Sequence, residues 1–353
     1  MHRGRATPYV STRWAGSKRR SLAALERAFS ELRFDTAVDV FSGSGAVAHL
    51  LKRMGKRVHA NDALACCVET ATALVVNGRT RLPEAKLASL FREAPGRRYR
   101  DTVYESWRGL YFLDEENHEL DVVAQNVHAL EDRFERALAW HALFQACLKK
   151  RPYALFHRAN LALRTRDVAR SFGNKTSWDA PLEQHFREAL AEAHAALVDD
   201  DRGHLATRLD ALACPLDAEL VYLDPPYVRG DGRGFDYADG YHLLEGLLDY
   251  DALSRGIDAE RKHRPYRSAP RTDFTRGESA TRALEALVER APSTSIIALS
   301  YRSDGVPSAE ALVAMLERSG RRVTSSTSSE HGYALSRTES AELLLVATPR
   351  RTR

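Results

Sequence analysis

The segment of clearest chemical interest is Asp224-Pro225-Pro226-Tyr227, which directly follows the apolar run 220–223. Each proline fixes its own φ and lacks an N–H donor, so the turn holds the Asp224 carboxylate and the Pro225 carbonyl in one rigid direction. Two such acceptors suit an amine on a planar ring, because they take its hydrogens and free its lone pair, while Tyr227 offers a stacking face. The alternative without chemistry is a simple proline turn after a strand.

A glycine-rich turn is the second chemical feature. The segment Phe41-Ser42-Gly43-Ser44-Gly45-Ala46-Val47-Ala48 follows a short apolar strand, opens a helix and fits a G-x-G-x-x-A pattern. About 20 residues later, Asp62 closes a second strand, where nucleotide-binding sheets place a carboxylate on ribose hydroxyls. The alternatives are an ordinary tight turn and, for Asp62, a helix cap. These features predict an adenosine-containing ligand and do not distinguish NAD from S-adenosylmethionine.

Asp39 is an acid within the otherwise apolar strand 36–41. A carboxylate placed there needs a cationic partner, because burying an unpaired charge is costly. We expect this partner to be either the ammonium group of the ligand or an ordinary Arg or Lys side chain.

The elements that position these residues alternate between strand and helix near both ends of the chain. Strand patterns at 36–41 and 57–60 alternate with helical patterns, and the alternation resumes with strands at 218–223, 295–299 and 343–347. This order predicts a parallel α/β sheet, in which ligands sit beyond the carboxyl ends of the strands. The glycine turn, Asp62, Asp224 and the pair Ser300-Tyr301 should therefore line one edge.

Long helical patterns at 115–149 and 182–198 interrupt this alternation. We therefore predict an α/β core formed by residues 1–78 and 215–353, with a mostly helical insertion at residues 79–214. Two basic stretches, 149–170 and 261–276, are candidates for phosphate contacts. The residues we expect to contact DNA are Lys149, Lys150, Arg151, Arg158, Arg264, Arg267 and Arg271. The alternatives are a solvated helix face and a solvated loop, since a net charge of +4 permits a polyanion partner without requiring one.

Several classes of protein are disfavoured by what the sequence lacks. The four cysteines show no CxxC pairing and the 13 histidines form no recognisable ligand set, so we predict no metal site. The chain begins without an apolar leader and contains no membrane-length apolar run, which leads us to expect a cytoplasmic protein. Ser300 and Tyr301 lack an identifiable His or carboxylate partner, which argues against a hydrolase.

The order of the motifs resembles that of the adenine-specific DNA methyltransferases of the alpha arrangement, which include Dam-like and restriction-modification enzymes. In that family a Trp-Ala-Gly-x-Lys segment, a Phe-x-Gly-x-Gly turn, a target-recognition region and Asp-Pro-Pro-Tyr follow one another. Here they correspond to Trp14-Ala15-Gly16-Ser17-Lys18, Phe41 to Gly45, residues 79–214 and Asp224 to Tyr227. The segment 151–160 is similar to one found in restriction-associated members.

This resemblance implies a Rossmann-like S-adenosylmethionine-dependent methyltransferase core with an inserted, mostly helical target-recognition lobe. It implies that the target adenine is held by Asp224, Pro225, Pro226 and Tyr227. It also implies that the methyl donor is held by Trp14, Gly16, Lys18, Asp39, Phe41, Gly43, Gly45 and Asp62. Without the family, Trp14 would be interpreted as a buried anchor and Lys18 as a solvated charge.

The expected reaction is methyl transfer from S-adenosylmethionine to the exocyclic amine of an adenine flipped out of double-stranded DNA. We expect a monomer without membrane contact, with a cognate restriction endonuclease as a candidate partner. Another planar amine, such as that of cytosine in DNA, adenine in RNA or a protein glutamine, is the nearest alternative. An NAD-dependent oxidoreductase would leave Asp-Pro-Pro-Tyr unexplained, and a non-catalytic DNA-binding protein would need no donor pocket. Methylation of a cytosine ring carbon would require a cysteine nucleophile, which the proline turn lacks.

Overall fold

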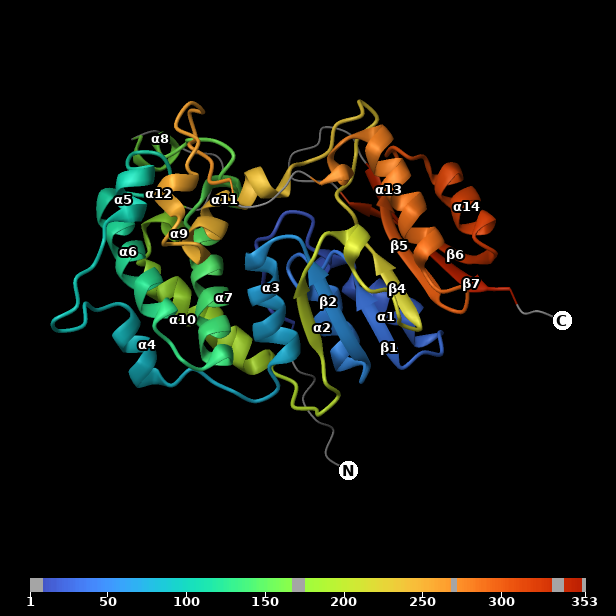
Figure 1. The fold of residues 1–353 in the computed structure, drawn as a ribbon, viewed down its shortest axis with the longest axis horizontal. Coiled ribbons are helices and arrows are strands. Elements are labelled where there is room, and N and C mark those ends of the chain that lie inside the picture. Colours follow the sequence, from blue (N-terminus) through green and yellow to red (C-terminus); the bar gives the residue numbers. More distant parts are fainter. Residues whose placement is uncertain (1–8, 167–174, 268–271, 332–339, 351–353) are drawn as a thin grey trace. The chain divides into compact units, whose positions relative to one another are not determined.

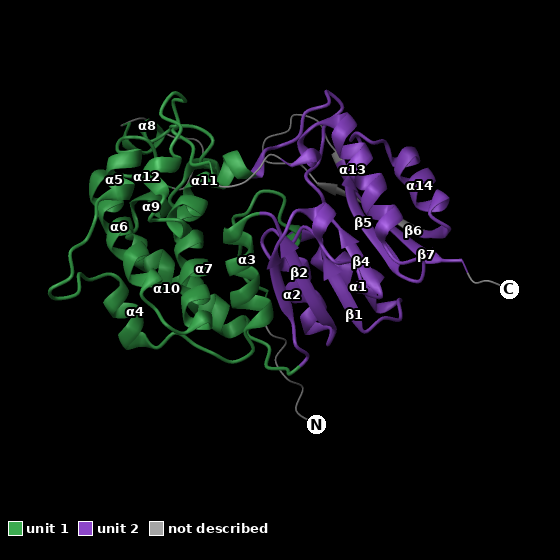
Figure 2. Ribbon diagram, in the orientation of Figure 1, with its two compact units in different colours: residues 1–19, 64–201, 238–270 green, residues 20–63, 202–237, 271–353 purple. Residues whose placement is uncertain are grey.

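The computed structural model describes residues 9–166, 175–267, 272–331 and 340–350. The chain forms two compact units, which Figure 2 distinguishes by colour. Unit 1 contains residues 1–19, 64–201 and 238–270, and unit 2 contains residues 20–63, 202–237 and 271–353. Each unit is built from separate stretches of the chain, so both depend on contacts between residues far apart in the sequence.

Unit 2 is built on a seven-stranded sheet in the order β3-β2-β1-β4-β5-β7-β6 (Figure 1). Strands β1 to β5 pair in parallel, whereas β7 runs antiparallel to both β5 and β6. The strands are Thr36–Asp39 (β1), Arg57–Asp62 (β2), Leu205–Arg208 (β3), Leu220–Leu223 (β4), Ile296–Arg302 (β5), Arg321–His331 (β6) and Ser340–Pro349 (β7). The strand order reverses between β1 and β4, and ligands of open α/β sheets bind beyond the carboxyl ends of strands at such a switch point.

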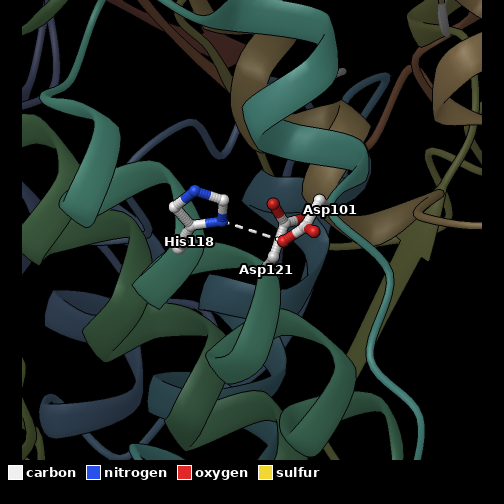
Figure 3. Close-up of side chains that lie close together, drawn as sticks. All are labelled: Asp101, His118 and Asp121. Atoms are coloured by element: carbon white, nitrogen blue, oxygen red, sulfur yellow. Dashed lines mark hydrogen bonds and ion pairs between the residues drawn. The ribbon is translucent and has the colours of Figure 1, made fainter.

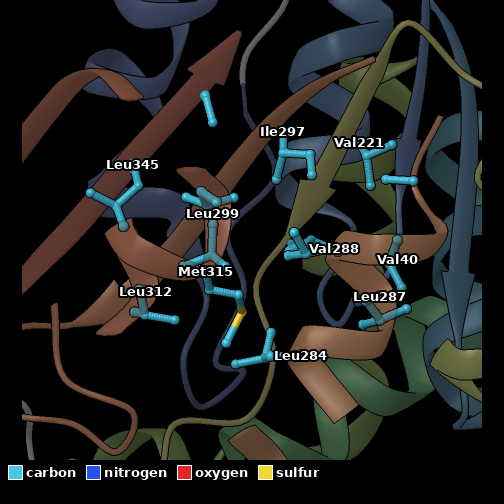
Figure 4. Close-up of a cluster of buried hydrophobic side chains, with 14 of the residues drawn as sticks. Val40, Val221, Leu284, Leu287, Val288, Ile297, Leu299, Leu312, Met315 and Leu345 are labelled. Atoms are coloured by element: carbon cyan, nitrogen blue, oxygen red, sulfur yellow. The ribbon is translucent and has the colours of Figure 1, made fainter. Parts of the chain in front are cut away.

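Helices cover the two faces of this sheet because the side chains of each strand alternate between them. On one face, Val221 and Leu299 pack with Leu284 of α13 and Met315 of α14 in a buried cluster (Figure 4). On the other face, the ring of Tyr222 meets Phe29 of α1, at 6.1 Å between ring centroids. The helices are α1 (Leu22–Ser30), α2 (Ala46–Arg53), α13 (Gly277–Arg290) and α14 (Ala309–Arg318).

Unit 1 is helical. Its long helices α6, α7 and α10 bury most of their apolar residues, and the largest buried side chains of the unit include Trp107 and Trp140. The helices are α3 (Ala65–Ala71), α4 (Glu84–Leu90), α5 (Thr102–Trp107), α6 (Asp114–His128), α7 (Arg133–Lys149), α8 (Ala162–Thr165), α9 (Lys175–Asp179), α10 (Leu182–Ala196), α11 (Tyr237–Leu248) and α12 (Leu253–Gly256). None of the described helices is long and apolar enough to cross a membrane.

The helical unit has different boundaries from the predicted insertion. It also takes in residues 1–19, 64–78 and 238–270, and it leaves out residues 202–214. The first helix after β2, α3, packs against α7 of the insertion, and Glu245 of α11 accepts a hydrogen bond from the Cys66 backbone at 2.8 Å. Residues 205–208 form strand β3, which pairs with β2. This strand is short and largely exposed, so it carries little apolar signal in the sequence.

Candidate active site

The glycine turn between β1 and α2 is attached to the end of β2. Gly43 and Gly45 have φ values of 50° and 71°, which a residue with a Cβ adopts only at a cost in free energy. The Gly43 N–H donates to Asp62 Oδ2 at 2.8 Å, and the Ser42 N–H donates to the Asn61 carbonyl at 2.8 Å. The turn and the Asp62 carboxylate, predicted to act together, therefore lie side by side in unit 2.

Asp39 ends β1 and is 1% exposed. Its carboxylate accepts backbone hydrogen bonds from Phe41 and Ala48, yet its buried Oδ1 has no hydrogen-bond partner in the part of the chain that the structure describes. Burial raises the pKa of Asp39, and the nearby carboxylates of Asp224 and Asp62 contribute in the same direction, so that the pKa is about 8. Three carboxylates thus gather at the carboxyl ends of β1, β2 and β4.

The Asp-Pro-Pro-Tyr segment follows β4 at this edge. The Tyr227 hydroxyl donates to Asp224 Oδ1 at 2.9 Å, which fixes the carboxylate, and lies 3.3 Å from Glu342 Oε1. Pro225 is buried, whereas Asp224, Pro226 and Tyr227 are half-buried. The turn therefore holds its carboxylate at the surface of the sheet edge.

Tyr227 is supported by Tyr301, which was expected at this edge, and by Glu342, which no motif revealed. The rings of Tyr227 and Tyr301 of β5 lie 5.2 Å apart between centroids, and the Tyr301 hydroxyl accepts a hydrogen bond from the Val228 N–H. Glu342 comes from β7 and also accepts a hydrogen bond from the Ser21 hydroxyl at 2.8 Å. Only the register of the antiparallel β5-β7 pair could have placed Glu342 here, and no motif encodes that register.

Ser300 and Tyr301 end up as structural residues at the end of β5. The Ser300 hydroxyl is buried against the Tyr222 hydroxyl at 2.8 Å, and the Tyr301 hydroxyl donates to the Val306 carbonyl. These contacts explain the pair by packing and give no support to a nucleophile.

The N-terminal motif lies in unit 1, where it forms a tight turn. The Trp14 ring stacks on Tyr241 of α11, at 3.6 Å between centroids and 11° between planes, and the Ala15 N–H donates to the Tyr241 hydroxyl at 2.7 Å. Lys18 is only 6% exposed, and its Nζ donates to the Gly16 carbonyl at 3.2 Å. Interpreting Lys18 as a solvated charge is therefore wrong.

The predicted donor-binding residues thus form two groups. Within unit 1 the structure brings together Trp14, Gly16 and Lys18, with Tyr241 as a partner that the sequence did not reveal. Within unit 2 it brings together Asp39, Gly43, Gly45 and Asp62, together with Phe41, whose half-buried ring meets Phe274 at 4.9 Å.

The candidate DNA contacts differ sharply in exposure. Lys150 and Arg151 are 2% and 1% exposed, so the prediction that they contact phosphates is wrong for this structure. Lys150 pairs with Glu116 at 2.8 Å, and the Arg151 guanidinium donates to backbone carbonyls. Lys149 pairs with Glu188 at 3.0 Å. The exposed candidates are Arg158, Arg264 and Arg267, and Arg271 lies outside the described residues.

Asp101, His118 and Asp121 of unit 1 lie close enough together to hold a metal ion, although the sequence predicted no such site (Figure 3). Their contacts have a local structural explanation. Asp121 accepts the N–H groups of Val103 and Tyr104 at 2.7 and 3.0 Å at the start of α5. His118 Nδ1 lies 2.8 Å from Asp101 Oδ1, and the His118 ring stacks on Tyr104. Burial raises the pKa of Asp121 to about 6.

The sheet of unit 2, with a glycine turn and an acidic edge at its switch point, defines a Rossmann-like methyltransferase fold. The family model for the D12 class N6 adenine-specific DNA methyltransferases matches residues 14–264, and the chain belongs to this family. A curated relative, the Type II methyltransferase M2.HphI of Haemophilus parahaemolyticus, is 29% identical over 296 residues, which cover 82% of each chain. A solved structure, the rRNA methyltransferase aviRa of Streptomyces viridochromogenes, is 14% identical with a TM-score of 0.31, covering 94% of this chain and 85% of that one.

The chain is therefore an adenine-specific DNA methyltransferase that uses S-adenosylmethionine as the methyl donor. The expectation from the sequence is confirmed, and the alternatives of a cytosine amine, an RNA substrate and an NAD-dependent reaction fall away. The acidic edge fits this donor, whose sulfonium and ammonium groups are cationic. The buried Oδ1 of Asp39, which has no hydrogen-bond partner among the described residues, and the adjacent Asp62 and Asp224 favour such a ligand electrostatically.

Proposed function

We propose that methyl transfer takes place at the carboxyl edge of unit 2, with Asp224 and the Pro225 carbonyl as acceptors for the hydrogens of the adenine N6 amine. This amine is a poor nucleophile because its lone pair is delocalised into the ring. Two acceptors free the lone pair and stabilise the positive charge that develops during attack. The observation that carries the proposal is the Tyr227 hydroxyl, which donates to Asp224 Oδ1 and so fixes the carboxylate.

The other residues of this edge have positioning roles in the proposal. S-adenosylmethionine supplies the methyl group on its sulfonium. The Asp39 carboxylate offers a buried acceptor to a cationic group of the donor, and Asp62 is placed beside the glycine turn to accept from ribose hydroxyls. The Tyr227 ring stacks on the target adenine, which must leave the duplex to reach this edge. Trp14, Gly16 and Lys18 also hold the donor in this proposal, and the turn they share with Tyr241 supports a common role.

Replacing Asp224 tests the proposed chemistry. The Asp224→Ala variant should lose methyl transfer to DNA while its affinity for S-adenosylmethionine, measured by calorimetry, stays within a few-fold of the wild type. The matched control is Asp217→Ala, which removes an exposed acid before β4, at the opposite end of the same strand. Methylation by the Asp224→Ala variant at the wild-type rate would refute the assignment.

The helical unit is the proposed site of target recognition, and Arg158, Arg264 and Arg267 are its proposed phosphate contacts. Their exposure supports this role, because phosphate contacts require cations that reach solvent. We further propose a cytoplasmic monomer that acts alongside a cognate restriction endonuclease. The name of the Type II relative supports the restriction context. Sedimentation of the free protein should give the monomer mass of 39.5 kDa.

A further inference from the structure

Tyr153 combines high exposure with an unfavourable backbone conformation. Its side chain is 56% exposed, the highest value among the large hydrophobic residues that the structure describes. Tyr153 and Ala154 have φ values of 64° and 54°, in the left-handed region that residues with a Cβ avoid. The exposed ring of Tyr153 gains little free energy from packing, while its backbone conformation costs free energy. Residues with such backbone conformations concentrate at functional sites.

The buried Arg151 holds this loop in place. Its guanidinium donates to the carbonyl oxygens of Tyr111 at 3.0 Å, Arg158 at 3.1 Å and Leu155 at 3.2 Å. It also lies over the rings of Tyr111 and Phe156, at 4.7 and 5.3 Å from their centroids. The chain from 151 to 158 therefore winds around one cation, and this arrangement keeps Tyr153 on the outside.

The buried Tyr111 and His242 hold a second loop, residues 256–267, beside the first. The Tyr111 hydroxyl donates to the His263 carbonyl. His242 accepts the Tyr266 N–H at Nδ1 and donates from Nε2 to the Phe156 carbonyl, both at 3.2 Å. Burial lowers the pKa of His242 to about 3, so the ring is neutral and this pattern persists at neutral pH. Both loops lie at the end of unit 1 that is marked by α8 in Figure 1.

The charge around Tyr153 indicates what it meets. Residues 149–166 contain no Asp or Glu, and the exposed cations in this stretch are Arg158 and Arg166. On the second loop Lys262 and Arg264 are exposed beside the exposed Glu260, and Arg267 is paired with Asp258, so cations outnumber acids on the two loops together. A projecting aromatic ring among cations matches a polyanion that also presents flat apolar faces, and nucleic acid combines these two properties.

We propose that Tyr153 is a DNA-contacting residue whose ring stacks on a base of the substrate duplex, while the cations around it contact phosphates. The inference rests on the proposed role of unit 1 in target recognition and adds an aromatic contact to it. In this arrangement Arg151 is a positioning residue that contacts no DNA. It lies at the centre of the loop that presents the ring.

The test compares Tyr153→Asn with Tyr153→Phe in the full-length protein. Asparagine tolerates the left-handed backbone but removes the ring, whereas phenylalanine keeps the ring. The probe is a duplex that carries the site found by mapping methylated adenines after expression in a host lacking adenine methylation. We expect Tyr153→Asn to raise the Kd for this duplex roughly 5- to 100-fold and Tyr153→Phe to bind the duplex like the wild type. Leu205→Asn, at an exposed apolar residue of unit 2, is the matched control.

Two further measurements separate stacking from a merely structural role. Stacking releases no counterions, so Tyr153→Asn should keep the wild-type dependence of log K on log salt, whereas Arg158→Ala should reduce that slope by about 0.9. The unfolding temperature of Tyr153→Asn should be unchanged or higher, because asparagine relieves the unfavourable φ.

The outcomes distinguish this inference from the proposed function. Unchanged DNA affinity in Tyr153→Asn would overturn the stacking role while leaving methylation by the wild type intact. A lowered unfolding temperature together with a smaller salt slope would show that Tyr153 only maintains the loop, which also overturns the inference. Failure of the wild type to bind or methylate DNA would instead refute the proposed function itself.

Discussion

Asp39→Asn is a direct test of the acidic edge, because this variant removes a charge that the folded protein accommodates poorly. Burial, together with the nearby carboxylates of Asp224 and Asp62, raises the pKa of Asp39 from its ordinary value of 3.8 to about 8. A carboxyl whose pKa is higher in the folded state binds its proton more tightly there than in the unfolded chain. Asp39 therefore costs no folding free energy below about pH 4, and this cost grows as the pH rises toward 8.

The size of this effect follows from the pKa difference. One pKa unit corresponds to about 1.4 kcal/mol, so a shift from 3.8 to about 8 amounts to roughly 6 kcal/mol at most above pH 8. Between about pH 5 and pH 9 the free energy of unfolding of the wild type should fall by roughly 4 kcal/mol relative to that of Asp39→Asn. The neutral amide should therefore make the ligand-free protein more stable at alkaline pH, although it removes a proposed donor contact.

Chemical denaturation of both proteins at several pH values gives these free energies, and comparing the two proteins cancels the other titrating groups. Calorimetry with S-adenosylmethionine supplies the second readout. A cationic group next to Asp39 lowers its pKa, so binding to the wild type at neutral pH should release a proton that Asp39→Asn does not release. If the free energies of unfolding of the wild type and Asp39→Asn change in parallel with pH, burial does not destabilise the Asp39 carboxylate.

The remaining predictions concern packing in unit 1. Arg164 donates two hydrogen bonds of 2.7 Å to Glu116 in a buried ion pair, so Arg164→Ala should lower the free energy of unfolding by about 3 kcal/mol in denaturant titrations. A destabilisation below about 1 kcal/mol would show that the pair is dispensable. A Cβ on Gly256 would lie 2.1 Å from the Tyr266 ring, so Gly256→Ala should cost about 1–3 kcal/mol, whereas Gly230→Ala meets only a backbone oxygen at 3.8 Å and should be nearly neutral. Equal unfolding temperatures for the two glycine variants would contradict this packing.

The parts of the fold that the sequence predicted are those encoded over short distances. The runs that became β1, β4 and β5 are apolar and buried, and their pattern is visible within a few residues. Strand β6 was not predicted, because the polar stretch 321–331 pairs with β7 at the edge of the sheet and carries no apolar run. Local sequence patterns also could not predict the unit boundaries, because α3 belongs to the helical unit through its packing against α7.

The candidate site also has a part that short sequence patterns predict and a part that depends on contacts between distant residues. The hydrogen bond between Gly43 and Asp62 agrees with the predicted geometry, because parallel strands bring their carboxyl ends to one edge. The sequence allowed Asp39 either a ligand cation or an ordinary Arg or Lys. Among the described residues, neither kind of protein cation hydrogen-bonds to its buried Oδ1. The partner of Asp39 depends on which side chains converge on its carboxylate, and those side chains come from other strands.

The basic stretch after α7 shows why a run of charges is a weak guide to a binding surface. Lys149, Lys150, Arg151 and Arg158 look equivalent in the sequence, but the fold gives them different partners. Lys150 turns toward Glu116, and Arg151 turns toward the backbone carbonyls of its own loop and of Tyr111. These two cations stabilise the lobe, and only a cation left exposed, such as Arg158, remains able to contact phosphates. The cations that bind DNA should therefore be sought among those that the folding of the lobe leaves exposed, and the buried ones explain how the exposed ones are presented.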